Sequence, residues 1–471
     1  MPINSFLYPG AKVTTAYEVA NSCRFNDGDS AYMTRANAGS DGTTDTWTMS
    51  MWVKRGVLGS TQYLFQGYTS GNFNVSLRFT SDDQLYFFQE DHPAQNGRLL
   101  MTTERKFRDC SSWYHILAQY DSTQSTNTDR AKIYINGVQE TTFNGSVTWP
   151  DQNFDSEMTS ASTNIHIAKE NGGDYFDGYM AEVVLLDGTA ATPTSFGEYD
   201  EDSPTIWKPK DVSGLSFGTH GFYLDFEDSS NLGNDANGGT DFTESGLATT
   251  DQSSDSPTNN FATWNPLFRK GTTTPAFAEG SLKSTFDDGG ANEFALTTFG
   301  VSAGKWYAEV KWPSNTGTAA TATGILDMAY TGTDDPNNAV TNAFGYFGSG
   351  TKNVSGTASS YGDSYADNDI IGIAIDMDNN KLYFSKNGTF QDSGDPTSGS
   401  TGTGAISIVS GVTYGIFASD YNSQVAELNT GSPPFSISSG NSDANGYGNF
   451  EYSVPSGYLA LCTKNLGESG G

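Results

Sequence analysis

The acidic segment GEYDEDSP brings Glu198, Asp200 and Glu201 close together in the sequence. Hydrolysis of a glycosidic bond needs two carboxyl groups that flank it, about 5–5.5 Å apart in retaining enzymes and about 6.5–9.5 Å apart in inverting enzymes. Side chains of a strand reach the same cleft only when they alternate, and Glu201 breaks that alternation. Gly197 and Pro204 flank the run and favour a loop. We therefore expect no catalysis at this segment.

The histidines form no recognisable catalytic or metal-binding pattern. His115 and His166 lie inside apolar segments typical of strands, so we expect both to pack in or on a sheet. His92 and His220 stand alone in the sequence. No glycine-rich loop leads from a strand into a helix, as a phosphate-binding loop does. These patterns predict a protein that is not an enzyme.

The stretch after residue 224 is rich in side-chain oxygens. Ca²⁺ takes roughly six to eight oxygen ligands from carboxylates, amides and backbone carbonyls. The candidate ligands are Asp225, Asp228, Asn231 and Asp235, with Asn234 and Asn237 between and beyond them. Their spacing is not that of a helix–loop–helix calcium site, and a solvated polar loop explains the same residues. Both interpretations stay open, and residues 171–177, NGGDYFD, are a second, weaker candidate for Ca²⁺.

The chain is strongly acidic, with 55 Asp and Glu against 24 Lys and Arg and a formal net charge of −31. Such a charge argues against a nucleic acid bound through basic patches. It also disfavours attachment to anionic membranes. The simplest role of the excess charge is solubility.

The three cysteines are Cys23, Cys110 and Cys462. They are too few for a disulfide framework, and their spacing is not that of a zinc site. Because each lies in or beside an apolar or aromatic run, we expect buried free thiols.

Exposed aromatic rings beside turns are the usual requirement for stacking against a sugar. Four aromatic residues stand in such places, and they are Tyr68, Trp149, Tyr175 and Tyr361. Any single aromatic residue is more often part of a core or its rim. The sequence alone therefore identifies no sugar site.

Composition and periodicity predict an all-β protein. The chain has 53 glycines and 13% aromatic residues, which suits many short strands joined by tight turns. Residues 46–53, TWTMSMWV, alternate as a half-buried strand does. Asn-Gly follows the apolar segments 132–135 and 381–386, and this dipeptide is the strongest short signal for a hairpin.

The segments divide into four parts. We predict a docking arm at residues 1–20, a first domain at 21–246, a polar linker at 247–260 and a second domain at 261–471. The first ten residues lack the basic and apolar regions of a signal peptide, and no long apolar stretch follows. We expect a protein made in a cytosol and not exported by the usual route.

The first domain resembles the laminin-G-like, concanavalin-type jelly roll. The resemblance rests on WTMSMWVKRG (47–56), WYHILAQYDS (113–122), AKIYINGVQE (131–140) and IHIAKENGGDYFDGYMAEVVLLDG (165–188). The second domain resembles the SPRY domain, through GKWYAEV (304–310), DIIGIAIDMDNNKLYFSKNGTF (369–390) and VPSGYLALCTKNL (454–466). The resemblance implies two concanavalin-like antiparallel β-sandwiches in series.

The order of the parts also resembles virion proteins of bacteriophages, particularly marine ones. MPINSFLYPG at the start and DSPTNNFATWNPL (255–267) between the domains carry this resemblance. It implies a tail-fibre or appendage subunit that docks to other virion proteins through residues 1–20 and forms a homotrimer. The distal loops would bind a glycan or protein of the host surface. A capsid or tail decoration protein and a glycan-degrading enzyme are the alternatives.

Overall fold

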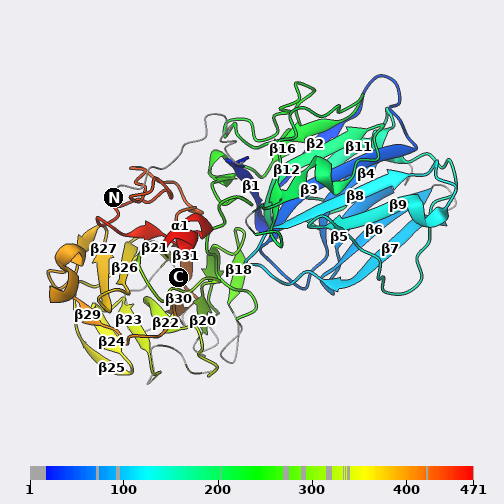
Figure 1. Cartoon of the computed structure of the whole chain (residues 1–471). Helices are drawn as coiled ribbons and strands as arrows, with labels where there is room; N and C mark the ends of the chain where they lie inside the picture. The colour runs from blue at the N-terminus through cyan, green and yellow to red at the C-terminus, as the bar shows by residue number, and fades with distance from the viewer. Residues whose placement is uncertain are drawn as a thin grey trace, which may run out of the picture.

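The computed structural model describes residues 17–69, 74–91, 96–201, 203–268, 275–287, 293–314, 321–332, 334, 336, 340–420 and 423–469. These residues form 32 strands and one α-helix, α1 (Thr463–Ser469). Short 3₁₀ helices lie at Asp27–Asp29, Asn127–Asp129, Glu157–Thr159, Pro193–Ser195, Thr249–Asp251 and Pro396–Thr401. The strands gather in two lobes that lie side by side (Figure 1). The predicted all-β fold class, two sandwiches in series, is confirmed.

The first sandwich packs an eight-stranded sheet against a seven-stranded sheet. The eight-stranded sheet follows the order β10 (Val138–Gln139), β9 (Ala131–Ile135), β8 (Tyr114–Asp121), β3 (Thr46–Arg55), β12 (Gly178–Asp187), β1 (Ser22–Phe25) and β17 (Gln252–Ser253), and β15 (Phe222–Leu224) pairs with β12. The seven-stranded sheet follows the order β16 (Thr243–Ser245), β2 (Tyr32–Ala36), β11 (Asn164–Ile167), β4 (Gln62–Tyr68), β5 (Asn74–Phe79), β6 (Gln84–Asp91) and β7 (Asn96–Lys106). A hairpin of β13 (Gly197–Tyr199) and β14 (Trp207–Pro209) lies outside both sheets.

Alternation along the strands builds the core of this sandwich. In β3 the side chains of Trp47, Met49, Met51 and Val53 are fully buried between the sheets, as the period of two predicts. The opposite face of the eight-stranded sheet is covered as well. Part of it packs under the segment that holds Phe196, and part packs against the second sandwich. The central strands of this sheet are therefore covered on both faces, while β10 at its edge stays exposed.

The second sandwich packs a nine-stranded sheet against a six-stranded sheet. The nine-stranded sheet follows the order β18 (Ala276–Ala278), β19 (Lys283–Thr285), β31 (Val425–Asn429), β21 (Lys305–Ser314), β26 (Ile370–Asp376), β27 (Lys381–Lys386) and β28 (Thr389–Phe390), with β29 (Ile406–Ser407) beside β27 and β32 (Leu459–Ala460) beside β21. The six-stranded sheet follows the order β20 (Glu293–Leu296), β30 (Tyr414–Asp420), β22 (Ala322–Asp327), β23 (Ala343–Phe347), β24 (Thr351–Val354) and β25 (Thr357–Ser360).

A buried polar joint connects the two sandwiches. Lys54 of β3 donates to the carboxylate of Asp255 at 2.6 Å, to the Asn260 side chain at 2.6 Å and to the Phe261 carbonyl at 2.8 Å. Arg24 of β1 pairs with Asp251 at 3.1 Å. It also reaches residues of the second sandwich, pairing with Glu279 at 3.1 Å and donating to the Pro433 carbonyl.

The segment predicted as a polar linker is built into this joint. Gln252 and Ser253 form β17, which pairs with β1 and extends the eight-stranded sheet. Asp255, Ser256, Asn259 and Asn260 are buried. The predicted docking arm lies outside the described residues, except for residues 17–20. Of these, Val19 exchanges hydrogen bonds with the hydroxyl of Thr258.

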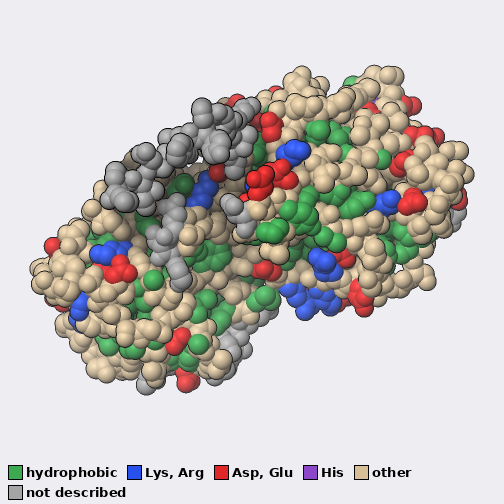
Figure 2. Space-filling model, viewed as in Figure 1, with side chains coloured by type: hydrophobic (Ala, Val, Ile, Leu, Met, Phe, Trp, Pro, Cys, Tyr) green, Lys and Arg blue, Asp and Glu red, His purple; other side chains and the backbone are tan. Residues whose placement is uncertain are grey.

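None of the helices in the described ranges is long and apolar enough to span a bilayer. On the face shown in Figure 2, acidic side chains are scattered over both lobes, with fewer Lys and Arg side chains among them.

Candidate functional site

The candidate calcium ligands form hydrogen bonds and an ion pair with nearby groups of the protein. Asp228 accepts hydrogen bonds from the Ser230 amide at 2.9 Å and hydroxyl at 2.6 Å, which lower the pKa of its carboxyl. Asp235 is buried and pairs with Arg35 at 3.3 Å. Asn231 donates to Asp241 at 2.9 Å, and Asp225 accepts from the backbone. Among the described residues no group of three His, Cys, Asp or Glu side chains is placed to hold a metal ion. The Ca²⁺ site stays a prediction, and this geometry favours the polar loop.

The carboxylates at residues 198–201 lie on an exposed hairpin. Glu198 belongs to β13, so the prediction of a loop is wrong at this residue. Lys208 of the paired strand β14 lies 3.7 Å from Glu198 and 3.3 Å from Asp200. An ion pair that bridges two strands accounts for both carboxylates.

His115 and His220 have structural partners. His115 is completely buried, where Trp207 Nε1 donates to its Nδ1 at 3.1 Å and its Nε2 lies 2.9 Å from Ser50 Oγ. His220 is 5% exposed, and its Nε2 lies 2.9 Å from the Ser40 carbonyl oxygen. The packing role predicted for His115 is confirmed, and His92 lies outside the described residues.

The thiols and two of the four aromatic candidates belong to cores. All three cysteines are free and buried, as predicted, and burial raises the pKa of Cys110 to about 12 and of Cys462 to about 11.

Tyr361 is buried, with its hydroxyl accepting from the Phe384 amide. Trp149 packs edge-to-face on Phe143 beside the first core. Tyr68 and Tyr175 instead remain partly exposed.

The outer face of the seven-stranded sheet gathers aromatic and polar side chains. We define the seven-strand face by the outward side chains of β2, β11, β4, β5 and β6 together with the loop after β11. Its central members are Tyr32, Tyr63, Gln66, Ser76, Arg78, Tyr86, Phe88, His166, Lys169 and Tyr175. Strand register places them: Tyr63 opposes Arg78, and Arg78 opposes Tyr86. In the neighbouring row His166 opposes Gln66, which opposes Ser76.

Arg78 occupies the middle of this face between aromatic rings. Its guanidinium carbon lies 4.9 Å from the ring centre of Tyr63, 4.7 Å from that of Tyr86 and 5.8 Å from that of Phe88. It also donates to the hydroxyl of Tyr63. Burial raises the pKa of both tyrosines, although the charge of Arg78 opposes that rise. The rings are therefore neutral stacking surfaces at neutral pH.

A second cation lies on the loop that follows β11. Lys169 Nζ lies 3.8 Å from the ring centre of Tyr32 and 5.8 Å from that of Tyr175. The two rings are 6.1 Å apart. The loop is anchored to the sheet because the Asn171 amide donates to the Gln66 side chain at 2.8 Å and the Tyr63 amide donates to the Asp174 carbonyl. This loop is residues 171–177 of the weaker calcium prediction, and here it presents an aromatic ring.

Two buried polar atoms of the seven-strand face lack hydrogen-bond partners within the described residues. They are Ser76 Oγ and His166 Nδ1. His166 is 7% exposed, and burial together with the charge of Lys169 lowers its pKa to about 4. Its imidazole is therefore neutral at pH 7 and offers a hydrogen-bonding atom without a charge.

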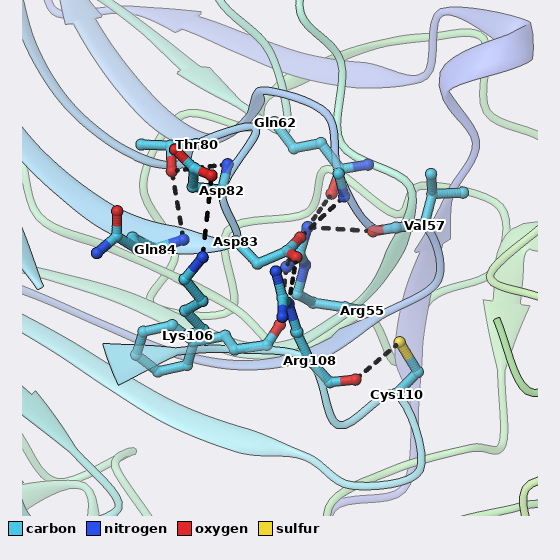
Figure 3. A network of polar contacts seen from close by, with 12 residues as sticks. Arg55, Val57, Gln62, Thr80, Asp82, Asp83, Gln84, Lys106, Arg108 and Cys110 are labelled. Carbon is cyan, nitrogen blue, oxygen red and sulfur yellow. Dashed lines mark hydrogen bonds and ion pairs between the residues drawn. The ribbon is translucent and has the colours of Figure 1, made fainter. Parts of the chain in front are cut away.

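A rigid network holds the strands that carry Arg78 and Tyr86. Asp83, in the turn between β5 and β6, accepts from Arg55 at 3.0 Å, from Arg108 at 2.8 Å and from the Gly59 amide at 2.8 Å (Figure 3). The guanidinium of Arg55 also stacks on Phe79. Burial alone would raise the pKa of Asp83, but these donors lower it on balance. The end of the β5–β6 hairpin is thereby fixed.

Sequence reasoning singled out Tyr68 and Tyr175 but missed Arg78, Tyr86 and Phe88. The available signal was QLYFFQE (84–90), where Tyr86 and Phe88 alternate with buried Leu85 and Phe87. Aromatic residues on the polar side of a half-buried strand mark an outer surface with apolar character.

Two regions of the chain match known families. Residues 27–194 match the family described as the Concanavalin A-like lectin/glucanases superfamily. Residues 305–411 match the SPRY domain. The chain therefore contains a concanavalin-like, laminin-G-like domain followed by a SPRY domain, as predicted, while the exact domain limits stay a prediction. No curated protein sequence matches the chain.

Several solved structures share a remote likeness. The SPRY domain of human HERC1 is 19% identical, with 35% of this chain and 96% of that one covered and a TM-score of 0.28. A putative carbohydrate binding protein from Bacteroides ovatus is 16% identical, with coverages of 48% and 58% and a TM-score of 0.32. A pentraxin from Limulus polyphemus is 17% identical, with coverages of 38% and 80% and a TM-score of 0.26.

Proposed function

We propose that this chain is a non-enzymatic recognition protein that binds glycans through the seven-strand face. One observation carries the proposal. Both faces of the central strands of the eight-stranded sheet are covered by packed side chains, whereas the outer face of its partner sheet holds partly exposed Tyr32, Tyr86 and Phe88. Aromatic rings backed by amide and hydroxyl groups suit a ligand with apolar ring faces and polar edges, as sugars have.

Substitution of the two aromatic residues of β6 tests this site. We expect Tyr86→Ala with Phe88→Ala to weaken binding to oligosaccharides on a glycan array by about tenfold or more, since each removes a stacking surface. Tyr199→Ala is the matched control, because Tyr199 is 46% exposed and lies on the separate β13–β14 hairpin. Unchanged glycan binding by the double variant would exclude the seven-strand face.

We further propose that the protein is a homotrimeric subunit of a bacteriophage tail fibre or particle appendage that contacts the host surface. Support comes from the resemblance of residues 1–10 and 255–267 to phage virion proteins. Mass spectrometry of purified particles should find the chain, and sedimentation of the native protein should give a trimer. Absence of the chain from particles, together with a monomeric mass, would refute the proposal of a homotrimeric phage subunit.

A decoration protein of the capsid or tail is the second candidate. It would bind the particle and not the host. Adsorption of the isolated protein to host cells separates the two, because only a receptor-binding subunit adsorbs. A glycan-degrading enzyme is the third candidate, and chain-length analysis of host polysaccharide with wild type and Glu198→Gln tests it. Cleavage lost in that variant would contradict the non-enzymatic proposal.

A further inference from the structure

Two cations of the seven-strand face lack the partner that most cations of this protein have. In the described part of the chain most Lys and Arg side chains pair with a carboxylate within 4.0 Å. No such pair involves Arg78 or Lys169 in these ranges. Carboxylates are not scarce, because the chain has 55 acidic residues. The two cations are held by aromatic rings instead.

The rings fix the position of each charge without neutralising it. A cation over an aromatic face gains about 0.5–1 kcal/mol at an exposed site and keeps its hydrogen-bond donors. The Arg78 guanidinium uses one donor on Tyr63 Oη, and its remaining donors can form a fork that matches a carboxylate or a sulfate. Both cations are partly exposed, so an anion reaches them from solvent.

The two cations are spaced along the direction in which the strands are stacked. Lys169 follows β11 and contacts Tyr32 of β2, while Arg78 lies on β5, two strands from β11. Neighbouring strands lie about 4.8 Å apart, so the charges are separated by roughly 10–14 Å. Tyr63 lies between them. A chain of sugar rings with repeated acidic groups fits this order of cation, ring and cation.

Acidic residues border the face and limit where an anion can lie. Glu170 and Asp174 act on Tyr63, and Glu90 acts on Tyr86, each raising the pKa of the phenol. An acidic group is attracted over Arg78 and Lys169 and repelled at the border, which selects for regularly spaced charges over a uniformly anionic surface.

We propose that the seven-strand face binds acidic oligosaccharides, with Arg78 recognising a carboxylate or sulfate group and Lys169 a second one. This proposal rests on the glycan-binding function proposed above and names its substrate class. Tyr63 lies under the stretch between the two acidic groups, and the partly exposed rings of Tyr32 and Tyr86, on the outer strands, pack against the sugar rings on either side of it.

Calorimetry with oligogalacturonate and with its methyl ester tests the charge requirement, since the ester keeps the sugar rings and removes the charge. A heparin fragment serves as the sulfated probe. We expect one acidic probe to bind about tenfold or more tightly than the ester, and added salt to weaken that binding. Arg78→Gln should remove the preference, Arg78→Lys should restore part of it, and Lys381→Gln, on the second sandwich, should leave it unchanged.

Each outcome decides between the two proposals. Equal binding of acid and ester overturns the acidic specificity and leaves glycan binding intact. Binding of no probe overturns the acidic specificity, and the glycan array with the Tyr86→Ala, Phe88→Ala variant then decides whether this face binds glycans at all. Should Arg78→Gln fail to fold, as circular dichroism would show, Lys169→Gln and the salt dependence decide, and a preference that neither alters refutes the assignment.

Discussion

His115 is held neutral by its surroundings. It is completely buried between β3 and the β13–β14 hairpin, and its ring nitrogens have polar partners in Trp207 and Ser50. Burial lowers its pKa to about 3. The unfolded chain has an ordinary histidine pKa of about 6.5. Between about pH 3 and pH 6.5 it therefore binds a proton that the folded chain does not bind.

This difference predicts acid sensitivity. The free energy of unfolding should fall as pH decreases from about 6.5 towards 3, by up to several kcal/mol. Urea unfolding at a series of pH values measures it. His115→Gln removes the titrating group and should flatten the curve in this interval; a slope equal to that of wild type would contradict the prediction.

Single residues also show where sequence reasoning ends. The buried thiols and His115 could be predicted, because an apolar neighbourhood in the sequence implies burial. Arg78 could not, since its significance lies in Tyr63 and Tyr86 on the two adjacent strands and in the lack of an acidic partner among the described residues. Cross-strand neighbours depend on register, which one strand does not specify.

At the scale of elements, the bulge in β12 contains a buried carboxyl group, that of Glu182. The register with β3 shifts between Ala181 and Val184, and Glu182 adopts a φ of 51°. Its side chain is 5% exposed and accepts hydrogen bonds from Tyr17 and Tyr223. Burial raises its pKa to about 7, although the two hydroxyl donors oppose the rise.

The raised pKa of Glu182 predicts a loss of stability towards alkaline pH. The folded protein binds the proton more tightly than the unfolded chain, so the contribution is complete below pH 4.5 and is lost as pH rises through about 7. The loss should be on the order of 3 kcal/mol. Glu182→Gln should remove it in urea unfolding at pH 5 and pH 8, and identical pH dependence of the two proteins would argue against it.

The Asn136–Gly137 turn was predicted from sequence and its geometry is confirmed. Both residues have positive φ, 48° and 80°. A Cβ on Gly137 would lie 2.7 Å from the Trp207 ring. Gly137→Ala should cost about 1–2 kcal/mol of backbone strain and an additional steric term, measured by urea unfolding. Gly59→Ala is the control, because its φ is 77° with no atom near the new Cβ; an equal loss in both variants would exclude the steric term.

At the scale of the whole molecule, strand patterns and the two hairpin signals predicted two sandwiches, but not their joint. Local periodicity reports which side of a strand is dry. It does not report what covers that side. Trp52 and Tyr179 of the first sandwich share a core with Trp264 of the second, and the residues of the joint read as a polar linker until their buried partners are known.

The joint should couple the unfolding of the two sandwiches. Lys54→Met leaves Asp255 buried without its counter-charge, and breaking a buried pair costs about 3–5 kcal/mol. Calorimetry should show one transition for wild type and a lower, broadened or divided transition for the variant. Lys208→Met removes an exposed pair worth less than about 1 kcal/mol and should resemble wild type. A Lys54→Met protein as stable as wild type would show that the joint contributes little.

The ion pairs of this joint also bear on recombination. Arg24 and Lys54 belong to the first sandwich by sequence and by sheet, yet the groups that accept their hydrogen bonds come from residues 250–261, Glu279 and Pro433. A gene fragment cut at residue 246 would encode a sandwich whose Arg24 and Lys54 have lost these partners and whose apolar residues Trp52 and Tyr179 have lost their cover from the second sandwich. The first domain therefore cannot be moved into another protein without the joint. A chimaeric protein should keep the joint with the first domain and change sequence only after it.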